Sequence, residues 1–170
     1  TEDLVLRWYG LGIFSPLLRN HSAKDTRRQE PYRFKNKAAF AGILQLRYLL
    51  LPYIYSEYMK AALHDGMYCM PLAFAFPEDD FARRVEDEVM IGESLLIAPV
   101  YEQNARGRYV YLPDTDCELK ILPGMYQFVT GDLDLSMIRN VQIEDLLGRE
   151  TVDVDVQSIM GYVSKKCVRH

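Results

Sequence analysis

Three consecutive polar residues, Arg19, Asn20 and His21, are the strongest candidates in this sequence for binding a polar ligand. They follow the apolar segment 13–18, which we predict to be a β-strand interrupted by Pro16. A proline removes a hydrogen bond from a strand, but it is accepted at a bulge near the rim of a sheet. In a (β/α)-barrel the interior is packed and functional groups lie at the C-terminal ends of the strands. The triplet therefore marks a candidate binding site, although a histidine that is simply hydrogen-bonded within a loop would have the same sequence.

The elements around the triplet follow from hydrophobic periodicity and capping residues. We expect a helix over residues 1–9, ended by Gly10 and Gly12, and a charged loop over residues 20–32. Residues 37–64 predict a long helix with one apolar face, capped by Asn36, kinked at Pro52 and closed by a glycine cap at Asp65-Gly66. Beyond Gly66, three apolar segments separated by turns predict an antiparallel β-domain with strands over 70–77, 90–100 and 108–113.

These motifs carry a resemblance to a known family. The chain is similar to the α-glucosidases of glycoside hydrolase family 31 in Arg-Trp at 7–8, Gly-x-Phe-x-Pro-x-x-Arg-Asn-His at 12–21, Arg-Gln-Glu-Pro-Tyr at 28–32, Leu-Arg-Tyr-Leu-Leu-Leu-Pro-Tyr at 46–53 and Gly-x-x-Leu-Leu-x-Ala-Pro-Val at 92–100. The resemblance implies an α/β plus β fold: the last βα portion of a (β/α)8 TIM barrel, followed by a small antiparallel β-sandwich-like domain. The expected division is residues 1–66 for the barrel portion, 67–117 for the start of the C-terminal β-domain, and 118–170 as an unassigned tail.

The resemblance also implies a reaction. Members of the family are retaining glycosidases that cleave terminal α-linked glucose from oligosaccharides, and two aspartates on earlier barrel strands break the bond. This chain is therefore expected to lack the catalytic pair, and Asp25 and Glu30 are expected to be solvated or ion-paired loop residues. His21 is expected to hydrogen-bond a sugar hydroxyl, since imidazole accepts on one nitrogen and donates on the other. Arg19 is a second candidate for binding substrate or a carboxylate, although pairing with a loop acid is favoured.

Composition sets the remaining expectations. A net charge of −4 gives no electrostatic basis for nucleic-acid binding, and the longest apolar run, residues 48–55, is too short to span a membrane. Cys69, Cys117 and Cys167 show no Cys-x-x-Cys spacing, which argues against a zinc or redox site and favours free thiols in a reducing cytoplasm. Neither a metal nor a cofactor is implied.

Two alternatives stay open at this level. Related enzymes cleave α-xylosides or transfer glycosyl units, and nothing in these residues separates those activities. The chain is also compatible with a non-catalytic remnant or interaction module that self-associates through open sheet edges, because a single βα unit cannot close a barrel. The 170-residue chain alone is expected to show no turnover.

Overall fold

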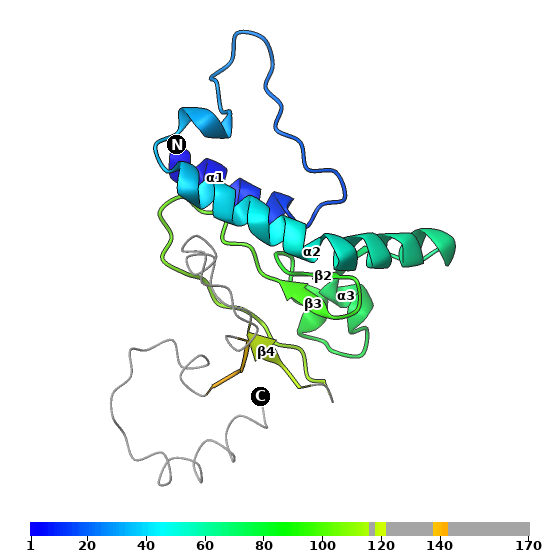
Figure 1. Ribbon diagram of the computed structural model, residues 1–170. Helices are drawn as coiled ribbons and strands as arrows, with labels where there is room; N and C mark the ends of the chain where they lie inside the picture. The colour runs from blue at the N-terminus through cyan, green and yellow to red at the C-terminus, as the bar shows by residue number, and fades with distance from the viewer. Residues whose placement is uncertain (116–117, 122–137, 143–170) are drawn as a thin grey trace, which may run out of the picture.

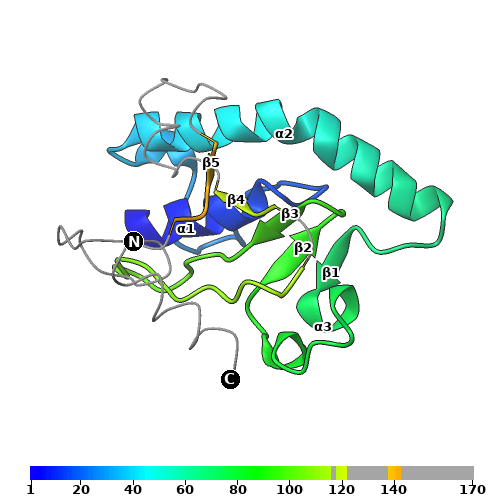
Figure 2. The same cartoon turned by 90° about the horizontal axis from the view of Figure 1, so that it is seen from below.

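The computed structural model describes residues 1–115, 118–121 and 138–142 (Figure 1). In chain order the described elements are α1 (Glu2–Gly12), the 3₁₀ turn η1 (Pro31–Arg33), α2 (Lys37–Leu63), β1 (Cys69–Pro71), α3 (Leu72–Ala75), the 3₁₀ turn η2 (Ala82–Arg84), β2 (Val89–Ile91), β3 (Leu95–Ile97), β4 (Lys120–Ile121) and β5 (Arg139–Asn140). Helices α1 and α2 lie side by side, and the small sheet β1-β2-β3 lies against the C-terminal half of α2 (Figures 1 and 2).

Helix α1 confirms the helix expected at the start of the chain, but it continues through Gly10 and ends only at Gly12. Thr1 caps its first turn by accepting a hydrogen bond from the Leu4 amide at 3.4 Å. Turn hydrogen bonds between residues three apart follow the helix end, and the Ser15 amide donates to the Gly12 carbonyl at 2.9 Å. A Cβ at Gly12 would lie 2.8 Å from Leu18 Cδ1, so this glycine allows the chain to fold back closely on the helix.

The predicted strand over residues 13–18 is wrong. These residues form turns and bends that prolong the end of α1, and in the described part of the chain no segment pairs with them. A strand needs neighbouring strands for its N–H and C=O groups. Here side chains from elsewhere in the chain donate hydrogen bonds to the carbonyls of this segment, as described below.

Helix α2 confirms the long helix predicted from periodicity, but its apolar side chains are not confined to one buried face, since Leu49, Tyr55 and Leu63 are exposed. The Asn36 side chain caps it by accepting from the Ala39 amide at 3.1 Å. Pro52 lies inside the helix, which bends in its middle part (Figure 2). The left-handed residue at its C-terminal end is Asp65, with φ 53°, rather than the expected Gly66, whose amide closes the end by donating to the Ala61 carbonyl at 2.8 Å.

By length and composition alone α2 could cross a membrane. Core helices of globular proteins meet the same criterion, and the buried residues of α2 pack in two clusters. The first joins Ile43 and Leu46 to the fully buried Ile13, and the second joins Ile54 to Tyr68 and strands β2 and β3. Phe14 and Leu50 pack against both clusters, so the helices and the sheet share a continuous apolar interior.

The β part differs from expectation in its details. Residues 70–77 form a strand only as far as Pro71, after which the chain enters the short helix α3 and buries Leu72 completely. The predicted single strand 90–100 is an antiparallel hairpin of β2 and β3 that reverses at Gly92, with Val89 opposite Ile97. The segment 108–113 is extended but belongs to no described sheet.

The expected tail begins with a second, two-stranded antiparallel sheet in which Lys120 pairs with Asn140. The rest of that tail, with Cys167, and also Cys117 lie outside the described residues.

Candidate functional site

The candidate triplet lies where the chain leaves the turn after α1. Arg19, Asn20 and His21 are all exposed, and the segment from α1 to η1 is a long loop that extends away from the two helices (Figure 1). The structure therefore brings the three polar side chains together at the base of an exposed loop rather than at the end of a strand.

The imidazole of His21 is oriented by Arg19. Arg19 Nη2 lies 3.3 Å from His21 Nδ1. A guanidinium can only donate, so Nδ1 accepts, and in a neutral imidazole the proton then lies on Nε2. The pair thus presents an N–H donor to a ligand. The loop-acid partner that was favoured for Arg19 is not found among the described residues, where its polar partner is His21.

Asn20 fixes the base of the loop. Its side-chain amide donates at 2.9 Å both to the Tyr9 hydroxyl and to the Gln29 carbonyl. The side-chain amide of Gln29 donates in return, from Nε2, to the His21 carbonyl at 2.9 Å. The two ends of the loop are therefore joined to each other and to α1, so that Asn20 has a structural role.

Two side chains that sequence reasoning missed bind the carbonyls of the turn before the triplet. Arg47 on α2 donates from Nη1 to the Ile13 and Ser15 carbonyls, at 2.5 and 2.8 Å, and from Nη2 to the Pro16 carbonyl at 3.1 Å. Tyr68 donates its hydroxyl to the Phe14 carbonyl at 2.6 Å. Burial raises the pKa of Tyr68 to about 12, so its hydroxyl stays a donor at neutral pH.

The two carboxylates of the loop region behave as expected for loop structure. Glu30 forms an ion pair with Arg33 at 3.0 Å, and its carbonyl accepts the Arg33 amide at the start of η1. Asp25 is exposed in a left-handed turn conformation with φ 65°. In the described ranges no group of three or more His, Cys, Asp or Glu side chains is placed to hold a metal ion.

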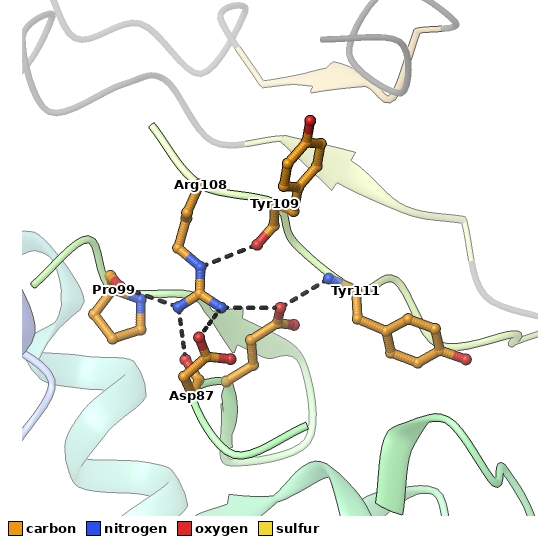
Figure 3. A network of polar contacts seen from close by, with 6 residues as sticks. Asp87, Pro99, Arg108, Tyr109 and Tyr111 are labelled. Carbon is orange, nitrogen blue, oxygen red and sulfur yellow. Dashed lines mark hydrogen bonds and ion pairs between the residues drawn. The ribbon is translucent and has the colours of Figure 1, made fainter. Parts of the chain in front are cut away.

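A second polar cluster joins the hairpin to segment 108–113 (Figure 3). Arg108 Nη2 contacts Asp87 Oδ2 at 2.6 Å and Glu88 Oε1 at 3.4 Å, while its Nη1 donates to the Pro99 carbonyl at 3.1 Å. Glu88 is 2% exposed and accepts the Tyr111 amide at 2.8 Å. Burial raises the pKa of Glu88 despite these two donors. Each donor of this cluster is used within the protein, so we assign it a structural role.

An open acidic hollow lies between the segment that follows α3 and the segment around Tyr111. It is lined by Phe76, Pro77, Glu78, Asp79, Asp80, Tyr111 and Asp114. Its innermost acid, Asp79, accepts the Tyr111 hydroxyl at 2.6 Å and the Phe81 and Ala82 amides at 2.9 and 3.1 Å. The hydrogen bond from Tyr111 lowers the pKa of Asp79. These bonds give Asp79 a structural role in holding the backbone at the start of η2, so the hollow is a weaker candidate than the His21 loop.

Comparison with family models places known domains over most of the chain. Residues 1–57 match the model of the glycosyl hydrolases family 31 TIM-barrel domain, and residues 65–158 match that of the glycosyl hydrolase family 31 C-terminal domain. These are the two parts, in the same order, that make up the expected fold class, which is thereby confirmed.

Similar curated proteins carry α-glucosidase names. The chain is 42% identical to a lysosomal alpha-glucosidase of Bos taurus over 60% of its length, and 32% identical to alpha-glucosidase 2 of Bacillus thermoamyloliquefaciens over 78%. It spans only 11% and 18% of these two relatives.

Similar solved structures include a glucosidase II alpha subunit bound to DNJ, with a TM-score of 0.65 and 33% identity, and a soil-metagenome GH31 alpha-xylosidase complexed with xylose, with a TM-score of 0.60 and 29% identity. Each likeness covers 70% of this chain, and 13% and 21% of those chains respectively.

Proposed function

Because this chain belongs to glycoside hydrolase family 31, we propose that it is part of a retaining α-glucosidase that removes terminal α-linked glucose from oligosaccharides. The observation that carries the proposal is the exposed His21 imidazole, oriented by Arg19 so that Nε2–H can donate to a ligand. A sugar hydroxyl accepts such a hydrogen bond. Arg19 keeps further N–H donors, and we propose that it contributes to the same sugar subsite.

The bond-breaking carboxylates are proposed to lie outside these residues. Retaining glycosidases use two carboxyl groups about 5–5.5 Å apart, one as nucleophile and the other as acid and then base. Glu30 is engaged by Arg33, and Asp25 lies in an exposed turn, so neither supports assignment to such a pair. In the proposed double displacement this chain binds and orients the sugar, and by itself gives no turnover. We also propose the domain division of the chain into a barrel portion ending at residue 66, a β-domain portion ending at residue 117, and a tail.

A second substrate class is favoured by one observation, the structural likeness to the GH31 alpha-xylosidase. An α-xyloside lacks the 6-hydroxymethyl group of glucose. The two substrates therefore differ only in this hydroxymethyl group, which residues of the complete sugar pocket would have to recognise. A non-catalytic remnant remains the alternative of a different class.

Location and assembly are also proposals. The exposed free thiol of Cys69 supports a reducing, cytoplasmic compartment. Self-association through sheet edges would involve the outer strands β1 and β3, since the strand once expected at 13–18 is not formed.

The test is hydrolysis by the complete natural protein of matched chromogenic α-glucoside and α-xyloside. The proposal predicts turnover of the α-glucoside with a higher kcat/KM than the α-xyloside, and no turnover by the isolated 170 residues. A higher kcat/KM for the α-xyloside would mean that the substrate is an α-xyloside rather than the proposed α-glucoside. Absence of turnover with both would favour the non-catalytic alternative.

A further inference from the structure

We infer that Arg47 is a positioning residue for His21: it binds the backbone turn from which the His21 loop begins. The inference rests on the proposed contact between His21 and the sugar. Arg47 itself lies on α2, and its contacts are with backbone carbonyls rather than with the triplet.

Arg47 donates to carbonyls that lie just beyond the end of α1. The last carbonyls of the helix itself, those of Tyr9, Leu11 and Gly12, already accept backbone amides. The carbonyls that follow lie near the negative dipole end of the helix, where a cation is stabilising. Helix α1 has no basic residue in its last turn. The half-buried Arg47 instead reaches across from α2 and donates to three carbonyls, of Ile13, Ser15 and Pro16, at 2.5, 2.8 and 3.1 Å.

The position of the turn is transmitted to His21 over a short distance in the chain. Only residues 17–19 separate Pro16 from Asn20, whose amide is bound to Tyr9 and Gln29. Within this stretch Leu18 packs against the first apolar cluster and closely approaches Gly12. The path from Arg47 to the triplet is therefore anchored at both ends, and a shift of the turn would move Arg19 and His21 with it.

The fork of the guanidinium is what this arrangement requires. Its two terminal nitrogens bind three carbonyls of the turn, those of Ile13, Ser15 and Pro16, whereas a lysine ammonium is a single point of charge on a flexible stem. Arg47→Lys keeps the charge and most of the apolar stem, so the protein is expected to fold. Displacements of about 1 Å at a binding group can cost as much as about 10²-fold in rate. We therefore expect Arg47→Lys to lower kcat/KM by about tenfold.

The first test is a double-mutant cycle in the complete natural protein, with kcat/KM for a chromogenic α-glucoside as the measured quantity. Arg47→Lys should lose about tenfold in the wild-type background but less than about twofold in a His21→Ala background, because the group that it positions is already gone. Tyr53→Phe is the matched control. It removes hydrogen bonds between α2 and the hairpin, to the Ile91 carbonyl at 2.6 Å and from the Ser94 amide at 3.1 Å, and its effect should be the same in both backgrounds. An equal loss for Arg47→Lys in both backgrounds would overturn the inference.

The second test does not depend on activity. Trypsin should cleave after Lys24, Arg27 or Arg28, in the loop, faster in Arg47→Lys than in wild type or Tyr53→Phe. Unchanged cleavage would overturn the inference, whatever the kinetics. If the wild-type protein fails to hydrolyse the α-glucoside, the proposed function fails and, with it, the role of Arg47 toward the sugar contact. Cleavage then decides whether Arg47 holds the loop.

Discussion

The hydroxyl of Tyr68 donates a 2.6 Å hydrogen bond to the carbonyl of Phe14, 54 residues earlier in the chain. Phe14 lies in the part that matches the family's barrel domain, and Tyr68 lies in the part that matches its C-terminal domain. Both residues also contribute to the second apolar cluster. The bond thus joins two parts of the chain at the turn that carries the candidate site.

Loss of this bond should loosen the turn. Tyr68→Phe leaves the Phe14 carbonyl without its donor, and we expect the free energy of local opening at residues 13–16 to fall by about 1–3 kcal/mol. Hydrogen exchange of peptides from this segment in the complete natural protein measures the change. Tyr55→Phe, at a tyrosine that is 67% exposed, is the control and should have no effect.

The pH dependence of the same bond follows from the pKa of Tyr68, which is raised from 10.0 to about 12 by burial. A hydroxyl with a raised pKa contributes its full stabilisation below about pH 10 and loses it as the pH rises through about 12. The difference in the free energy of local opening at residues 13–16 between wild type and Tyr68→Phe should therefore stay constant from neutral pH to about pH 10. A difference that declines below pH 9 would contradict the donor role.

Gly92 is predicted to be intolerant of any side chain. It reverses the hairpin with φ 61°, and a Cβ there would clash with the Glu57 side chain, only 2.4 Å from Cγ. Gly92→Ala should cost about 1–3 kcal/mol, combining a left-handed alanine with displacement of Glu57 and of its hydrogen bond from the Glu93 amide.

The matched control for Gly92 is Gly107→Ala, since a Cβ at Gly107 meets nothing within 4 Å. Thermal unfolding of the complete natural protein should show a clear decrease in midpoint for Gly92→Ala and none for Gly107→Ala. Equal midpoints for the two variants would show that the hairpin accommodates the added methyl group.

Glu88 should make the packing of segment 108–113 depend on pH. Burial raises its pKa above the ordinary 4.5, and its Oε2 is buried without a hydrogen-bond partner in the described part of the chain. A carboxyl with a raised pKa contributes most to stability below about pH 4.5, and that contribution is lost as the pH rises through its higher folded-state value.

The difference in protection of the Tyr111 amide between wild type and Glu88→Gln should accordingly change with pH over this window, in favour of Glu88→Gln as the pH rises. Hydrogen exchange, compared between the two proteins at each pH, measures it. Asp87→Asn removes a more exposed partner of Arg108. Its difference from wild type in protection of the Tyr111 amide should vary less with pH. A pH-independent difference for Glu88→Gln would mean that this carboxyl titrates normally.

The parts that the sequence predicted well depend on neighbouring residues. Helix α2 follows from periodicity and from the cap at Asn36, both of which act within a few residues. The strand expected at 13–18 failed because strand formation depends on distant partners, and a short apolar run after two glycines is equally compatible with a prolonged helix end. Gly92 did carry a signal for the missed hairpin, since an isolated glycine in an apolar run favours a reversal or close approach.

The candidate site divides in the same way. The triplet at 19–21 was found because its residue types and order are visible in the sequence. Arg47 and Tyr68 were not, because their partners lie 31–34 and 54 residues away, and neither side chain differs in type from many on the surface. Gln29 belongs to the motif at 28–32, but the residue types alone did not predict its hydrogen bond to the His21 carbonyl, eight residues away.

The most direct test of a sugar-binding role is the effect of His21→Ala on kcat/KM for a chromogenic α-glucoside, measured in the complete natural protein beside His64→Ala. His64 is an exposed histidine at the C-terminal cap of α2 and serves as the matched control. Loss of one hydrogen bond to a sugar hydroxyl should cost about 1–3 kcal/mol of transition-state stabilisation. We therefore predict that kcat/KM falls by about 5- to 150-fold for His21→Ala and does not change for His64→Ala. An unchanged kcat/KM for His21→Ala would contradict the proposed contact between His21 and the sugar.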